Sequence, residues 1–299
     1  MEIPPYLCKM RGRMRLTTLQ LAALIVLAGS SIAASRSDVP REAALEVRAV
    51  VEAPATARAA PFRPAPVMIG DAAGYSPPDF TTFRDVKAKK RAFYDYLLPM
   101  VHEANEEVAR ERAWLESLAR AMLDGHRPTE AELREIELIE ARYSVTTPAP
   151  APRGRLAELL RRVDVVPASL VIAQAAKESG WGTSRFAREG NNFFGIWCFY
   201  EGCGMLPLQR DTGRNHEVAT FDSVAEGVRY YIRTINTHAA YEELREMRRV
   251  ARAQNEKPVG TTLANGLIRY SERGLAYVRE IQSMIRYNGL SRFNRPYSV

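Results

Sequence analysis

At 299 residues the chain is long enough to bury one or two hydrophobic cores, and its 26% of charged and 46% of hydrophobic residues are ordinary for a globular protein. The formal net charge of +7 falls to about +4 without residues 1–35, which hold four basic side chains and one acidic one. No dense basic patch interleaved with aromatic residues is present, so the composition gives no support to nucleic-acid binding.

Residues 1–35 have the pattern of a signal peptide. A basic stretch from Lys9 to Arg15 precedes an apolar run from Leu21 to Ala34, and we expect cleavage near Ala33 to Ser35. Met14 is an alternative start. The other interpretation is an uncleaved anchor, although the run is short for a membrane span. The sequence therefore predicts an exported protein of the periplasm or cell envelope, with no stable membrane span after processing.

The next two segments differ sharply in composition. Residues 36–80 are rich in Ala, Pro and Arg and lack hydrophobic periodicity, which predicts a disordered linker. Residues 81–145 carry apolar side chains at helical spacing and predict a small helical region. We expect Pro99 to bend or interrupt its first helix. Thr129 and Glu132 have the spacing of a capping box, which opens a second helix.

Residues 150–292 are predicted to form a mostly helical domain. Pro167 fits the first turn of a helix and Gly180 fits its end. Ser223 and Glu226 form a second capping-box pattern. Further helices are expected over Tyr241–Arg252 and Leu275–Tyr287.

An irregular segment interrupts this helical pattern. Residues 192–221 have no helical period and hold four glycines, so they predict a lobe of loops with at most short strands. The predicted fold class is therefore mainly α, with a small irregular or β lobe that forms a cleft against the helices, preceded by the small helical region.

The most informative acidic residue is Glu178, in the last turn of the helix before Gly180. The helix dipole disfavours a carboxylate there by roughly 0.3–1 kcal/mol, and a nearby aromatic residue such as Trp181 could desolvate it further. Both effects raise the pKa and favour the protonated acid that a glycosidase needs to protonate a leaving oxygen. The alternative is a solvated helix-end residue paired with Lys177 or Arg185.

The motifs around this residue resemble a known family. The stretch LVIAQAAKESGWGTSRFAREGNNFFGIWC, residues 170–198, resembles the core signature of the glucosaminidase domain of glycoside hydrolase family 73. The stretches WCFYEGCG, HEVATFDSVAEGVRYYI, NTHAAYEELR and LIRYSERGLAYVREIQSMI are similar to its Bax protein subgroup. The resemblance covers residues 150–290. It implies a lysozyme-like fold and a domain that cuts the glycan strands of peptidoglycan.

The resemblance also implies roles for individual residues. Glu178 matches the general acid of the family. Five further residues match the motif that builds the wall of the cleft, where aromatic rings stack on sugars and amides bind N-acetyl groups. These substrate-binding candidates are Trp181, Asn191, Asn192, Phe194 and Gly195. Their alternative role is to pack the lobe against the helix.

A second catalytic group is harder to assign. Glu217 in HEVATF is the first candidate, with Glu201 and Asp211 as weaker ones. A second acid is not required if the 2-acetamido oxygen of the sugar attacks its own anomeric carbon. Stabilisers suggested by family-like placement, each of which could equally be a core tyrosine, are Tyr230, Tyr231 and Tyr270.

The two cysteines of the lobe, Cys198 and Cys203, predict a local disulfide in an exported chain, with free thiols as the alternative. A zinc site with His216 and His238 fits no usual ligand spacing. We predict no metal. The chain also has no phosphate loop, dinucleotide fingerprint or serine elbow, so we predict no cofactor.

Together these patterns predict a peptidoglycan hydrolase, an endo-β-N-acetylglucosaminidase with Glu178 as general acid. One alternative is a non-catalytic envelope protein that binds peptidoglycan or a protein partner. Another is a muramidase or lytic transglycosylase that cuts the other glycosidic bond. The predicted partner is the glycan strand of peptidoglycan, and the sequence does not identify any protein partner.

Overall fold

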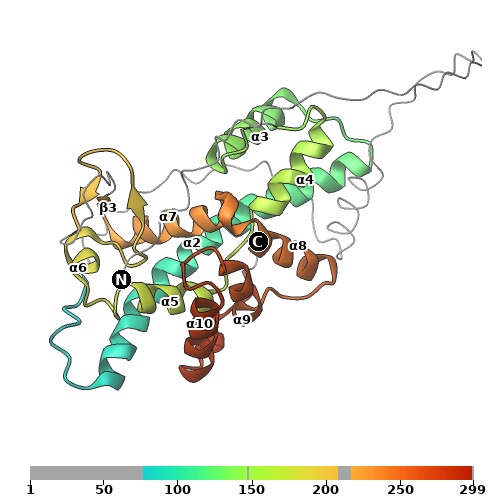
Figure 1. Cartoon of the computed structure of the whole chain (residues 1–299). Coiled ribbons are helices and arrows are strands. Elements are labelled where there is room, and N and C mark those ends of the chain that lie inside the picture. The colour runs from blue at the N-terminus through green and yellow to red at the C-terminus, as the bar shows by residue number, and fades with distance from the viewer. Residues whose placement is uncertain (1–76, 147, 208–216, 298–299) are drawn as a thin grey trace, which may run out of the picture.

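The computed structural model describes residues 77–146, 148–207 and 217–297, so the predicted signal peptide and nearly all of the linker lie outside the described residues. Helices dominate the described part, and one small sheet accompanies them (Figure 1). The mainly α fold class is therefore confirmed. The helices are α2 Val86–Leu123, α3 Glu130–Arg142, α4 Pro152–Arg162, α5 Ala168–Glu178, α6 Arg185–Gly190, α7 Val224–Thr237, α8 Glu242–Ala253, α9 Gly260–Leu263 and α10 Leu275–Tyr287, with 3-10 turns η1 Ala239–Tyr241, η2 Ala264–Leu267 and η3 Leu290–Phe293.

Helix α2 is a single helix of 38 residues, and Pro99 lies inside it without interrupting it. It packs against α4, α5 and α7. One hydrophobic core contains Leu97 of α2, Leu159 of α4 and Val171 of α5. The helical region 81–145 thus shares its core with the helices that follow. The domain boundary drawn from the sequence stays a prediction.

The capping residues define where several helices begin. At α3 both halves of the predicted capping box are present between Thr129 and Glu132. At α7 the Ser223 side chain accepts from the backbone of Glu226 at 3.2 Å, whereas the Glu226 carboxylate accepts from Asp222 N. The Glu226 side chain therefore binds the backbone of Asp222, one residue before Ser223, whose backbone nitrogen the capping-box pattern predicts as its partner.

The predicted lobe contains a three-stranded antiparallel sheet, beside α6 in Figure 1. Its order is β1-β3-β2, formed by β1 Trp197–Cys198, β2 Gly204–Met205 and β3 Glu217–Ala219. Gly204 faces Ala219 so closely that an added Cβ would lie 2.0 Å from the Val218 carbonyl oxygen. Only glycine fits at this register, which explains one of the glycines of the lobe.

Helix α5 lies at the centre of the fold. Every residue from Ala168 to Ala176 is buried, and the helix contacts α2, α9, α10 and η3. Its small alanines let these neighbours approach closely. Because the last turn leaves the core, the helix carries Glu178 to a half-buried position at its end.

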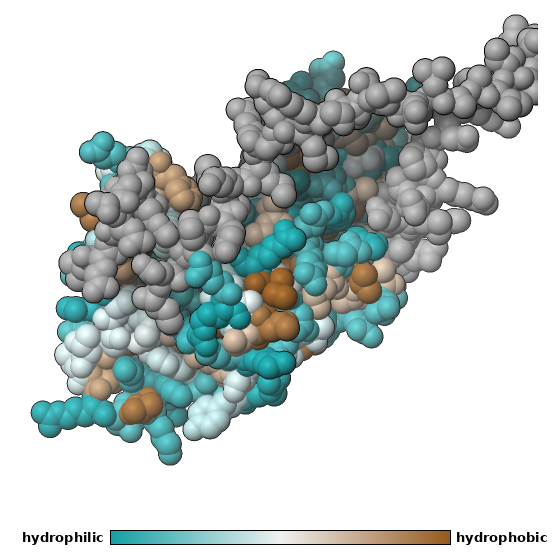
Figure 2. Space-filling view, viewed as in Figure 1, coloured by the Kyte–Doolittle hydropathy of each residue, from teal (hydrophilic) through white to brown (hydrophobic). Residues whose placement is uncertain are grey.

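The surface seen in Figure 2 is mostly hydrophilic, and its hydrophobic side chains occur in small groups. Within the described ranges, none of the helices combines the length and hydrophobicity that a membrane crossing requires.

Candidate active site

Glu178 is the last residue of α5, and its side chain is held by a tyrosine from α10. The Tyr277 hydroxyl donates a hydrogen bond of 2.8 Å to Oε1 of Glu178. Burial raises the pKa of the Glu178 carboxyl above its ordinary value, and the bond from Tyr277 opposes that rise. The predicted direction of the perturbation is therefore present, with burial as its largest cause.

The basic residues that could have neutralised Glu178 are engaged elsewhere. Lys177 forms an ion pair of 2.8 Å with Glu280, and Arg185 donates to the Leu206 carbonyl at 2.6 Å. Lys177 still lowers the pKa of Glu178 through its charge, while Glu280 raises it. The solvated helix-end pair that the sequence left open is thus not the observed arrangement.

A directed chain of hydrogen bonds leads to the acid. Tyr231 donates to Oε1 of Gln174, whose Nε2 donates to the Tyr277 hydroxyl at 3.0 Å. Since Tyr277 has a single hydroxyl hydrogen and gives it to Oε1 of Glu178, a proton on the acid is placed on Oε2. Gln174 and Glu178 are four residues apart on one face of α5, so the helix aligns both ends of this chain.

Further aromatic residues surround this chain. Tyr270 stacks on Tyr277 at 5.1 Å between ring centroids, and Tyr241 lies 6.1 Å from Tyr270. Burial first, and the charge of Glu178 second, raise the pKa of all three phenols. These tyrosines stay protonated and act as hydrogen-bond donors or packing groups. Tyr231 and Tyr270 were predicted near the site, whereas Tyr241 and Tyr277 were not.

Phe194 joins the lobe to this aromatic cluster. Its ring stacks on Tyr231 at 4.1 Å, and its carbonyl accepts from the Tyr270 hydroxyl at 2.8 Å. The side chain is 1% exposed, so it packs within the fold. Gly195 follows with φ +64, a backbone conformation that glycine adopts without strain, and an added Cβ there would meet open space.

Trp181 packs toward α2. Its ring lies 5.4 Å from Phe93 and 5.9 Å from Tyr94, and the Lys90 ammonium sits 4.8 Å above it. The side chain is partly buried against the core. These contacts support the packing alternative for Trp181.

The two predicted asparagines serve the backbone of the lobe. Asn191 ends α6 in the left-handed conformation, and its amide donates to Phe221 O at 2.9 Å. Asn192 is 2% exposed and its amide makes four bonds with backbone groups. It donates to Ile196 O and Ala219 O and accepts from Phe194 N and Ile196 N. This fixes the strand-bearing loop and leaves little of the Asn192 amide for a sugar.

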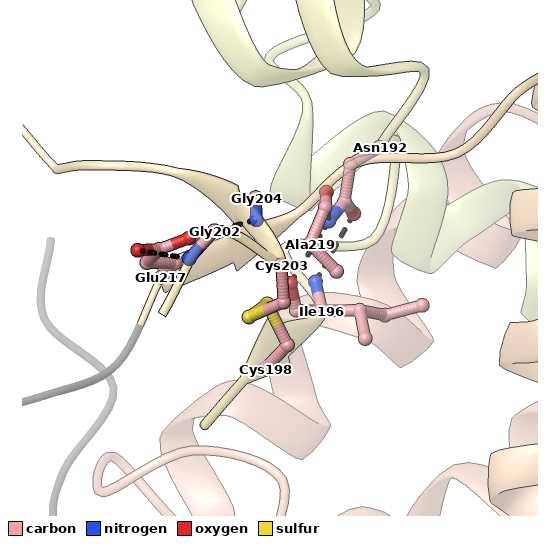
Figure 3. The surroundings of a disulfide bond; sticks show 8 residues. All are labelled: Asn192, Ile196, Cys198, Gly202, Cys203, Gly204, Glu217 and Ala219. Carbon is pink, nitrogen blue, oxygen red and sulfur yellow. Dashed lines mark hydrogen bonds between the residues drawn. A yellow bond between two sulfur atoms is a disulfide. The ribbon is translucent and has the colours of Figure 1, made fainter. Parts of the chain in front are cut away.

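Glu217 lies on β3, beside the disulfide (Figure 3). The predicted bridge between Cys198 and Cys203 is present, with their Cα atoms 6.1 Å apart. The Glu217 carboxylate accepts from Gly202 N at 3.1 Å and from Gly204 N at 2.8 Å. It therefore clamps the loop that the disulfide closes. Within the described ranges, the three residues Cys198, Cys203 and Glu217 lie close enough to hold a metal, but the disulfide occupies both sulfurs.

Among the described residues, no contact joins the remaining predicted residues to Glu178. Tyr230 is 45% exposed and its ring lies 5.4 Å from Phe221. Glu201 is exposed on the disulfide loop. His238 accepts from Ala240 N through its own Nδ1. Asp211 and His216 lie outside the described residues.

No local signal in the sequence marks Tyr277. It belongs to the apolar stripe of α10 with Val278, Ile281 and Ile285 and would be taken for a core residue. Only the packing of α10 on α5 brings it to Glu178, which lies 99 positions earlier in the chain.

Comparisons with known proteins identify the family of the domain that holds this site. A family model described as Glucosaminidase, Mannosyl-glycoprotein endo-beta-N-acetylglucosaminidase, matches residues 155–290, which include Glu178, Glu217 and Tyr277. The chain is also 32% identical over 211 residues to Protein bax of Escherichia coli (strain K12), covering 71% of this chain and 74% of that protein. No solved structure matches the chain.

Proposed function

The chain belongs to the glucosaminidase family, and from this premise we propose that it is an exported endo-β-N-acetylglucosaminidase that hydrolyses the glycan strands of peptidoglycan. The observation that carries the proposal is the half-buried Glu178, whose raised pKa and single phenol partner suit a general acid. The predicted signal peptide supports action outside the cytoplasm.

In the proposed reaction, Oε2 of Glu178 gives its proton to the glycosidic oxygen while the bond from that oxygen to the anomeric carbon breaks. The leaving sugar departs as an alcohol, and Glu178 is left as a carboxylate. Tyr277 then donates to a charged oxygen, and hydrogen bonds of this kind are about twice as strong as neutral ones. Burial raises the pKa of Glu178 and favours its protonated form before the step, and Tyr277 stabilises the carboxylate after it.

The group that assists cleavage from the opposite side of the anomeric carbon has two candidates. Glu217 is the carboxylate predicted for it, but its oxygens accept from Gly202 N inside the disulfide loop and from Gly204 N directly after it, and these bonds would have to break for it to act. The 2-acetamido oxygen of the substrate needs no such rearrangement. The bonds of Glu217 therefore favour assistance by the substrate, whose acetamido oxygen bonds to the anomeric carbon as the glycosidic bond breaks. Water then attacks the anomeric carbon, the bond to the acetamido oxygen breaks, and the water proton passes to the Glu178 carboxylate, which restores the acid.

The test is release of reducing ends from purified peptidoglycan by a Glu178→Gln variant. Losing the transferable proton typically lowers the rate by about 10²–10⁴-fold. Glu189→Gln is the matched control because Glu189 is also acidic and lies nearby in sequence on the exposed face of α6. Full activity of a folded Glu178→Gln variant would defeat the proposal. Mass spectrometry of the new reducing-end sugar identifies the bond and separates a glucosaminidase from a muramidase or lytic transglycosylase.

A second candidate function is a non-catalytic peptidoglycan-binding protein. The observation that favours it is the engagement of Glu217, the predicted second carboxylate, by the backbone of the loop. Glycan binding by a wild-type protein that releases no reducing ends would select this function instead. The companion Glu217→Gln variant tests the mechanism, since a loss as large as that of Glu178→Gln would argue for two catalytic carboxylates.

A further inference from the structure

A cavity of about 280 Å³ lies at the opposite end of α5 from Glu178. With a rise of about 1.5 Å per residue, the two ends of this helix of 11 residues are roughly 15 Å apart. The cavity is therefore separate from the candidate active site. Its lining includes Arg112 and Glu116 of α2, Pro167 just before α5, and Arg252, Lys257 and Arg295.

The guanidinium groups of Arg112 and Arg252, which line the cavity, and of the fully buried Arg248 surround a single buried carboxylate. Asp164 is 2% exposed and accepts from Arg252 at 2.7 and 3.1 Å. Arg112 and Arg248 each lie 3.5 Å from the same carboxylate. Their charges hold the pKa of Asp164 far below its ordinary value despite its burial.

One carboxylate does not balance this cluster. Burial, and the charges of Arg112 and Arg252, lower the pKa of Arg248 to about 10 against the opposing effect of Asp164. Glu116 supplies one more negative charge, 2.8 Å from Nε of Arg112. The same Nε is buried and makes no hydrogen bond of acceptable geometry within the described part of the chain.

Two further cations stand at the rim. Lys257 is exposed and has no hydrogen-bond or ion-pair partner among the described residues. Arg295 is exposed and pairs with Glu106. Four basic side chains therefore line the cavity or its rim, and Arg248 lies buried behind them. The carboxylates paired with these five groups are Asp164, Glu116 and Glu106, which leaves an excess of two positive charges.

We propose that this cavity binds a small dianion, a dicarboxylate or a phosphate, between the buried arginine cluster and the two rim cations. Its volume is at the lower end of the range for small-molecule sites, which suits such a compact ligand. Guanidinium groups favour both carboxylate and phosphate oxygens because their fork of donors matches either geometry. Dicarboxylates and phosphate share this chemistry, and direct titration with each of them shows which one binds more tightly.

The test is isothermal titration calorimetry of the full chain with succinate, inorganic phosphate and acetate, at equal ionic strength. We expect at least one of the two dianions to bind saturably, with one molecule bound per chain. Acetate should bind at least about tenfold more weakly. The tighter of the two dianions identifies the ligand class. No saturable binding of either dianion, or acetate binding of equal strength, would overturn the proposal.

Charge reversal at the rim locates the binding. The double variant Lys257→Glu with Arg295→Glu should bind the dianion about tenfold more weakly or worse, because each reversal replaces attraction by repulsion. The control Lys87→Glu with Arg127→Glu makes the same change of net charge at exposed residues outside the cavity lining and should bind as the wild type does. Equal weakening in both variants would refute the site. The single Lys257→Glu variant carries the test if the double variant unfolds.

Discussion

The hydrogen bond from Tyr277 to Glu178 makes a prediction about the pH dependence of the reaction. Replacing Tyr277 by Phe removes one hydroxyl that donates to the acid at 2.8 Å and accepts from Gln174 at 3.0 Å. The bond lowers the pKa of Glu178, so its loss should raise that pKa further, because burial, the largest cause, remains. The alkaline limb of the rate profile, where Glu178 loses its proton, should then move to higher pH.

The same substitution has a cost in stability that follows from the geometry. Gln174 is 0% exposed, and without the phenol its Nε2 has lost its acceptor. A buried donor left without a partner costs about 1–3 kcal/mol of unfolding free energy. For a domain of this size that corresponds to a drop in melting temperature of roughly 2–4 °C per kcal/mol.

The assay is the pH profile of reducing-end release by Tyr277→Phe, with thermal unfolding as the measure of folding. Tyr230→Phe is the matched control, because Tyr230 is 45% exposed and lies outside the hydrogen-bond chain. A folded Tyr277→Phe variant whose alkaline limb stays in place, or moves to lower pH, would refute the role assigned to this bond. A stability loss alone would leave Tyr277 as a packing residue.

Three other substitutions and one processing step follow from the same contacts. Asn192→Ala removes four hydrogen bonds to the backbone of the lobe and should lower the unfolding free energy by about 2–4 kcal/mol, measured by urea denaturation; a loss under about 0.5 kcal/mol would contradict the clamp. Cys198→Ser with Cys203→Ser opens a short loop, so the loss should stay below the ~3 kcal/mol of a fifteen-residue loop, and non-reducing peptide mapping should find the bridge in the wild type. Because its folded pKa is raised, Glu178 favours folding most below its unfolded pKa and loses that contribution as the pH rises through the folded pKa. Glu178→Gln should therefore gain about 0.3–1 kcal/mol over the wild type at neutral pH and less at acid pH, and a variant less stable at both would oppose this. Amino-terminal sequencing of envelope protein should begin near Ala33 to Ser35, and intact Met1 or Met14 in the cytosol would exclude processing.

Features that depend on neighbouring residues could be predicted from the sequence. The end of α5 at Glu178, the box at Thr129 and the bridge between Cys198 and Cys203 each involve groups at most five positions apart. Local geometry decides such contacts, since a capping side chain reaches only the next turn of its own helix. The bounds of α10 also agree with the apolar pattern from Leu275 to Tyr287.

Features that depend on distant contacts could not be predicted in this way. Pro99 lies inside α2 because packing against α4, α5 and α7 outweighs the local cost of the missing donor. The partners of the Asn192 amide become visible only when β3 lies beside its loop. Tyr277 reaches Glu178 through the packing of two helices that are far apart in the chain.

The protonation of Glu178 depends on two opposing effects, burial and the hydrogen bond from Tyr277, and the proposed reaction needs both of them. Burial raises the pKa of the Glu178 carboxyl and so favours the protonated form, which has a proton to give. Without Tyr277, the carboxylate formed by the reaction would have no donor at Oε1, and the acid would release its proton less readily. The donor is in turn positioned by Gln174 and Tyr231, and Tyr231 stacks on Phe194 at the base of the lobe. Since Asn192 binds the backbone nitrogen of Phe194, the clamp of the lobe and the protonation of the acid belong to one contiguous set of contacts. A substitution that loosens the lobe should therefore disturb the acid through Phe194, even though no lobe side chain hydrogen-bonds to Glu178 among the described residues.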